Sequence, residues 1–134
     1  MNLRIVSVAL AALVLVSARA EAAGGPVFSK EQAERGREAY VHSCVMCHGE
    51  GLDDGDFGGA PLRGSWFRGH WGSGDVAALF SYLKTAMPPD NPASLSDKSY
   101  SDITAYILLR NNYPAGDSDM PPDEDALAKM SLQR

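Results

Sequence analysis

The chain has 134 residues, of which 45% are hydrophobic and 22% charged, enough for one globular domain and too apolar for wholesale disorder. Its formal net charge of −5 argues against a basic surface that binds nucleic acid. Two cysteines are too few for a small domain held together by disulfides.

The N-terminus has the three parts of an export signal. A positive start ending at Arg4 precedes an uncharged apolar run, residues 5–16, which is too short to span a bilayer comfortably. We therefore expect residues 1–22 to be a signal peptide, with a periplasmic mature protein that has no stable membrane insertion. An uncleaved anchor is the alternative. The expected cleavage sites follow small residues of A-x-A type patterns: Ala20, Ala22 or Ala23.

Three segments carry the signals of amphipathic helices, namely a polar residue that can cap the first turn and apolar residues at helical spacing. The expected helices cover about residues 30–44, 76–86 and 97–111, after the N-caps Ser29, Asp75 and Ser96. The first start matches a capping box, because Gln32 follows Ser29 by three residues. No segment alternates as a strand does, so we expect an all-α fold.

The segment between the first two helices, residues 49–72, is rich in glycine, and we expect it to be a long ordered loop. Long loops in compact domains are uncommon and usually functional. We expect the domain to span residues 23–114. An acidic tail, residues 115–134, follows it, with room for one short helix at residues 123–130. The modest apolar faces of the helices suggest that a large apolar ligand completes the core.

One pentapeptide, Cys44-Val45-Met46-Cys47-His48, has the C-x-x-C-H spacing that attaches a c-type haem. Two cysteines three residues apart near a helix end can form thioethers with the two vinyl groups along one edge of the macrocycle. The next residue, His48, then lies beneath the iron as an axial ligand. We therefore expect one haem c, covalently attached through Cys44 and Cys47.

Other uses of the two cysteines fit the chain less well. A structural zinc site needs four ligands, and the sequence has no second pair at zinc spacing. A thioredoxin-like dithiol would accompany a βαβ pattern, which the sequence lacks. A plain disulfide is the third alternative to haem attachment.

The second axial position decides whether such an iron passes electrons or binds substrates. Met87 comes directly after the second expected helix, and the proline behind it fixes the backbone that presents its thioether. A neutral thioether favours Fe(II) and fills the sixth position. A methionine that only fills a gap in the core is the alternative role. The competing ligands are a methionine in the tail and two histidines: Met120, His42 and His70.

With His48 and Met87 as axial ligands, the chain resembles class I monohaem cytochromes c of the short bacterial type over residues 29–114. The resemblance implies an all-α cytochrome c-like fold, with three main helices and long loops packed around one covalently bound haem c. It also implies that Gly36 on the first helix lets Tyr106 of the last helix approach closely, because close approach requires a residue without a Cβ.

The same resemblance assigns further residues around the haem. The backbone carbonyl of Pro61 would accept a hydrogen bond from the Nδ1–H of His48, which fixes the tautomer and makes the histidine a better donor. Two tryptophans and two arginines of the same loop are candidates for packing on the haem and holding its propionates: Trp66, Trp71, Arg63 and Arg68.

The resemblance implies an electron carrier and not an enzyme. Its partners would be redox proteins (a dehydrogenase, an oxidase or a membrane complex), and the chain itself would be a monomer. Residues 76–112 look most like small cytochromes that accompany periplasmic quinoprotein or flavoprotein dehydrogenases, so a fixed subunit of such a complex is the alternative. A gas-binding or peroxidatic haem protein is a third reading, but four-helix cytochromes of that sort carry the haem motif near the C-terminus.

Overall fold

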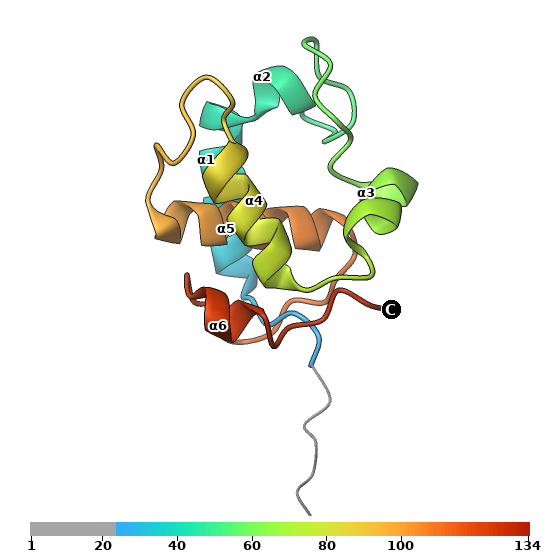
Figure 1. The fold of residues 1–134 in the computed structure, drawn as a ribbon, viewed down its shortest axis with the longest axis vertical. Helices are drawn as coiled ribbons and strands as arrows, with labels where there is room; N and C mark the ends of the chain where they lie inside the picture. The colour runs from blue at the N-terminus through green and yellow to red at the C-terminus, as the bar shows by residue number, and fades with distance from the viewer. Residues whose placement is uncertain (1–23) are drawn as a thin grey trace, which may run out of the picture.

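The computed structural model describes residues 24–134, so the expected signal peptide, residues 1–22, and its cleavage sites lie outside the described residues. The described chain forms α1 (Lys30–Ser43), α2 (Val45–His48), α3 (Gly64–Trp71), α4 (Val76–Ala86), α5 (Asp97–Arg110) and α6 (Glu124–Leu127). Within these residues, β-pairing is limited to isolated bridges. None of these helices has the length and apolar character that crossing a membrane requires. The expected all-α fold with three longer helices, α1, α4 and α5, is confirmed (Figure 1).

Each of the three longer helices begins at the cap that the sequence predicts. The side chains of Ser29, Asp75 and Ser96 accept hydrogen bonds from backbone N–H groups three residues later, which the first helical turn leaves without a partner. The capping box is only half formed. The Gln32 amide instead pairs with the backbone of Met120, accepting from its N–H at 2.6 Å and donating to its carbonyl at 2.9 Å.

The glycine-rich segment is not a loop throughout, because Gly64–Trp71 form α3 where the sequence predicted a loop. Glycine is a poor helix former, so the glycines inside this segment hid the helical pattern. Tertiary packing holds the helix in its place. Phe67 is fully buried in the core, and Trp71 at the end of α3 packs against that core.

Among the described residues, the most extensive contact between two helices is the crossing of α1 with α5 (Figure 1). A Cβ added at Gly36 would lie 1.8 Å from the carbonyl oxygen of Asp102 and 3.0 Å from the nitrogen of Ile103, so only glycine fits there. One turn further along α1, the rings of Tyr40 and Tyr106 pack with their centroids 5.3 Å apart. The predicted close approach is therefore present, although Gly36 faces the backbone of α5 and not an aromatic ring.

Residues 115–134, expected as an acidic tail, pack on the same core. Met120, Leu127 and Leu132 are each at most 1% exposed. The short helix α6 lies at the opposite end of the fold from α2 and covers fewer residues than the expected 123–130 (Figure 1). This last segment therefore packs against the helical core at the end far from the C-x-x-C-H motif.

We expect Gly36→Ala to lower the free energy of unfolding by about 2 kcal/mol or more, because the added methyl group overpacks the crossing of α1 and α5. Unfolding in guanidinium chloride measures this loss. Gly69→Ala is the matched control, since Gly69 also lies within a helix and nothing comes within 4 Å of its added Cβ. The control should leave stability unchanged or raise it. An equal loss in both variants would contradict the crossing as the cause.

Candidate haem-binding site

Cys44, Cys47 and His48 lie on one face of a single helical turn. Cys44 caps the end of α1, and the backbone N–H of His48 donates to the Cys44 carbonyl at 3.0 Å. Residues at positions i, i+3 and i+4 share a face of a helix, so the two sulfurs and the imidazole point to the same side. Gly49 ends the turn at a φ of 77°, which glycine adopts without strain.

No disulfide joins the two cysteines, and both are half-buried. Burial, followed by the neighbouring Cys47, raises the pKa of the Cys44 thiol to about 11. Cys44 is therefore protonated at neutral pH. A neutral, shielded thiol is poorly reactive in disulfide exchange, because the thiolate is the nucleophile.

His48 is buried, and its Nδ1 lies 2.8 Å from the backbone carbonyl oxygen of Ala60. Because a carbonyl only accepts, Nδ1 carries the hydrogen, and in the neutral ring Nε2 keeps a lone pair for a metal. The prediction that the Pro61 carbonyl accepts this bond is wrong by one residue. Pro61 still bears on the bond, because the residue before a proline is restricted to extended backbone, which limits how Ala60 presents its carbonyl.

The glycine-rich segment packs directly on this turn. The N–H of Gly59 donates to the Cys47 carbonyl at 2.9 Å. A Cβ at Gly59 would lie 2.5 Å from that carbonyl oxygen and 2.8 Å from Nδ1 of His48, and one at Gly55 would lie 2.0 Å from the same oxygen. These two glycines therefore allow the loop to close on the motif and to bring Ala60 within reach of the histidine.

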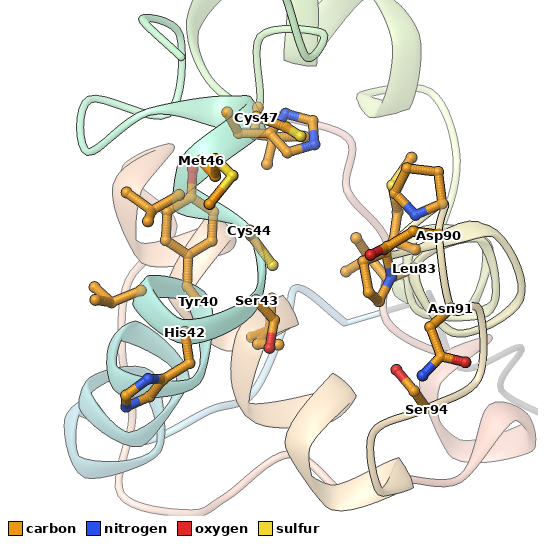
Figure 2. Close-up of a pocket in the computed structure, with 18 of the residues that line it drawn as sticks. Tyr40, His42, Ser43, Cys44, Met46, Cys47, Leu83, Asp90, Asn91 and Ser94 are labelled. Carbon is orange, nitrogen blue, oxygen red and sulfur yellow. The ribbon is translucent and has the colours of Figure 1, made fainter. Parts of the chain in front are cut away.

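Two adjoining cavities of about 500 and 340 Å³ lie beside the motif, and Met87 borders them with His48. The residues that line both cavities are Cys47, His48, Leu62, Leu83, Met87 and Pro89. The first cavity also reaches Cys44. Figure 2 shows Cys44 and Cys47 on one side of it, with Leu83 and Asn91 across the space. A flat group held between His48 and Met87 would therefore extend into both cavities.

The chemistry of the cavity walls fits a haem. Aspartate, glutamate, lysine and arginine contribute only Asp90 to the lining of the two cavities. The indole Nε1–H of Trp71, which lines the second cavity, is buried without a hydrogen-bond acceptor among the described residues. An unmet buried donor costs about 1–3 kcal/mol. A macrocycle with apolar faces would cover the apolar walls, and its carboxylate arms are acceptors of the kind that the Trp71 donor lacks.

Of the predicted aromatic and basic residues, the two tryptophans line a cavity and the two arginines do not. Trp71 lines the second cavity. Trp66 is 41% exposed and stacks on His70 at the edge of that cavity, with centroids 4.8 Å apart. Neither predicted arginine lines a cavity, and Arg63 pairs instead with Asp53 at 2.8 Å. The role of these arginines in holding the propionates stays a prediction, and Arg63 would have to leave the loop's own carboxylate to take it.

The alternative axial ligands are less well placed than Met87. Met120 is buried on the far side of α5, where its carbonyl accepts hydrogen bonds from Gln32 and Ser101, and it lines neither cavity. His42 and His70 are exposed and each lines one cavity only. Met87 is thus the candidate that shares both cavities with His48.

Sequence reasoning did not identify several residues of this site. Leu83 carried a signal, since it belongs to the apolar stripe of the second predicted helix, and it lines both cavities. Leu62 lies in the glycine-rich segment, where no periodicity marks it. Ala60 contributes through its backbone, and a backbone acceptor leaves no trace in the identity of its side chain.

We expect Gly59→Ala to lower the free energy of unfolding by about 2 kcal/mol, because its methyl group would push the loop away from Cys47 and His48. Gly58→Ala is the control: its added Cβ meets nothing within 4 Å, so only its positive φ of 70° opposes the change, at about 1 kcal/mol. Guanidinium unfolding of both variants measures the difference. An unchanged stability of Gly59→Ala would contradict close packing of this glycine against Cys47 and His48.

A comparison with known protein families matches residues 31–107 to the family described as cytochrome C oxidase, cbb3-type, subunit III. The match spans more than half of the chain and contains both the C-x-x-C-H turn and Met87. Comparisons with curated proteins and with solved structures find no significant match. The chain therefore belongs to this family of cytochrome c domains, which implies a covalently bound haem c and electron transfer through it.

Proposed function

We propose that the protein is an exported, periplasmic one-electron carrier with one haem c attached through Cys44 and Cys47 and ligated by His48 and Met87. The observation that carries this proposal is that His48 and Met87 border the same two adjoining cavities. When bound, haem c supplies an iron that alternates between Fe(III) and Fe(II), one electron at a time. The signal-like N-terminus supports export.

The surrounding residues would suit such an iron to electron transfer. The hydrogen bond from Nδ1 of His48 to Ala60 fixes the tautomer and raises the basicity of Nε2. The thioether of Met87 would close the remaining position, so that reactants exchange electrons without binding to the metal. Leu62 and Leu83 would keep water away from the metal, and an apolar surround disfavours the more highly charged oxidised state.

The mouth of the first cavity is the proposed contact point for redox partners. Met46 is 69% exposed and Val41 is 44% exposed, and both line this cavity close to Cys44 in the chain. Figure 2 shows Met46 beside Cys44 at the α1 side of the cavity. Exposed apolar side chains next to the attachment cysteines suit a brief contact with a dehydrogenase, an oxidase or a membrane complex.

A fixed cytochrome subunit of a larger enzyme is the second candidate. The description of the matched family names an oxidase subunit, and the sequence resembles cytochromes of quinoprotein or flavoprotein dehydrogenases. The chemistry at the haem is the same in both cases, and only the permanence of the partner differs. Size-exclusion chromatography of native extract separates them. A free carrier elutes at the mass of a single chain, whereas a subunit elutes with its enzyme.

We expect the purified protein to have the mass of the mature chain plus one haem under denaturing conditions, because two thioethers hold the group. A potentiometric titration should follow a single one-electron step.

Cys47→Ser should retain one thioether and shift the reduced α-band to longer wavelength, since an unreacted vinyl group stays conjugated with the macrocycle. Met46→Leu, a change between the two cysteines, should still carry the added mass of one haem and keep the spectrum of the unaltered protein. A haem that acid acetone extracts from the unaltered protein would contradict covalent attachment.

A further inference from the structure

Three buried tyrosines each donate a hydroxyl hydrogen bond to a backbone carbonyl, and one of these carbonyls belongs to Met87. The bonds run from Tyr40 to Gly49 at 2.7 Å, from Tyr100 to Met87 at 2.7 Å and from Tyr113 to Leu132 at 2.6 Å. All three side chains are at most 2% exposed. The three tyrosines can be compared directly, because each bond joins a hydroxyl to a backbone carbonyl and only the accepting residue differs.

The bond from Tyr100 completes the restraint of Met87. The N–H of Met87 donates to the Leu83 carbonyl at 3.1 Å, and the carbonyl of Met87 accepts from Tyr100. Each peptide unit is planar, so a residue has only φ and ψ as soft torsions. With the peptide unit on either side of its Cα held, the direction in which the Met87 side chain leaves the backbone is fixed.

Tyr100 is itself attached to a rigid part of the fold. It lies in the first turns of α5, and its own carbonyl accepts from the hydroxyl of Thr104 at 2.7 Å. α5 is locked against α1 at the crossing with Gly36. The loop between α4 and α5 is closed separately, by the backbone bond from Ala93 to Lys84 at 3.0 Å. Tyr100 thus connects the end of α4 to the pair formed by α1 and α5.

We propose that Tyr100 is a positioning residue that holds Met87 in place as an axial ligand and so keeps external ligands from the iron. This inference rests on the proposed ligation by His48 and Met87. Without the hydroxyl, the carbonyl of Met87 loses this donor and its ψ is free to vary. The thioether then spends more time away from the metal, and an external ligand competes better for the open position.

The test uses the oxidised, haem-loaded protein and imidazole as the external ligand. Loss of the far-red iron–methionine band on adding imidazole reports displacement of the methionine. We expect Tyr100→Phe to bind imidazole about fivefold more tightly than the unaltered protein, which is the equilibrium effect of one ordinary hydrogen bond. Tyr113→Phe, the matched control, should lose comparable stability in guanidinium but keep the unaltered affinity for imidazole.

Equal imidazole dissociation constants for Tyr100→Phe and the unaltered protein would overturn the inference, as would equal changes in Tyr100→Phe and Tyr113→Phe. An unaltered protein without the far-red band would instead contradict ligation by Met87, so the two failures are distinguishable. If Tyr100→Phe does not accumulate, 3-fluorotyrosine placed at position 100 replaces it. Its more acidic hydroxyl donates a stronger bond, so weaker imidazole binding is expected, and unchanged binding would overturn the inference.

Discussion

The close contact of α1 with α5 at Gly36 is the constraint on which the rest of the site depends. No Cβ fits between Gly36 and the backbone of Asp102. Direct backbone contact therefore sets the distance between the two helices. The two helices that meet at this contact each lead to one side of the candidate haem site. Cys44 follows the end of α1 on one side, and on the other Tyr100 of α5 reaches the carbonyl of Met87. The spacing between the two predicted axial ligands is therefore set by helix packing.

The protein core is built to be completed by its ligand. Apolar side chains from α4, α5 and the glycine-rich segment line two adjoining cavities. Trp71, which lines the second cavity, has a buried indole N–H without an acceptor among the described residues. Each feature is costly as long as the space holds nothing apolar and offers no acceptor. A covalently bound haem c, which membership of the family implies, would cover the apolar walls and bring carboxylate acceptors to this part of the fold. We therefore expect the bound group to contribute to the stability of the fold as well as to electron transfer.

Local patterns in the sequence predict the longer helices and the haem motif. They do not reveal which segments far apart in the chain contact each other. Ser29, Asp75 and Ser96 cap the predicted helices because capping depends on the three residues that follow. α3 went unrecognised because burial of Phe67, a tertiary effect, outweighs the low helix propensity of its glycines. The acceptor for His48 was misplaced by one residue, since any residue type can offer a carbonyl.

Far-red absorption of the oxidised protein is the most direct test of the central claim, that His48 and Met87 together hold one haem. Ligation by Met87 predicts the weak iron–methionine band in the unaltered protein and its loss in Met87→Ala, which should bind carbon monoxide when reduced. Met120→Ala alters a buried methionine that lines neither cavity, and it should keep the band. A band that persists in Met87→Ala would contradict the claim and indicate another methionine as the ligand. An unaltered protein that lacks the band and binds carbon monoxide freely would also contradict it and indicate a ligand-binding haem protein.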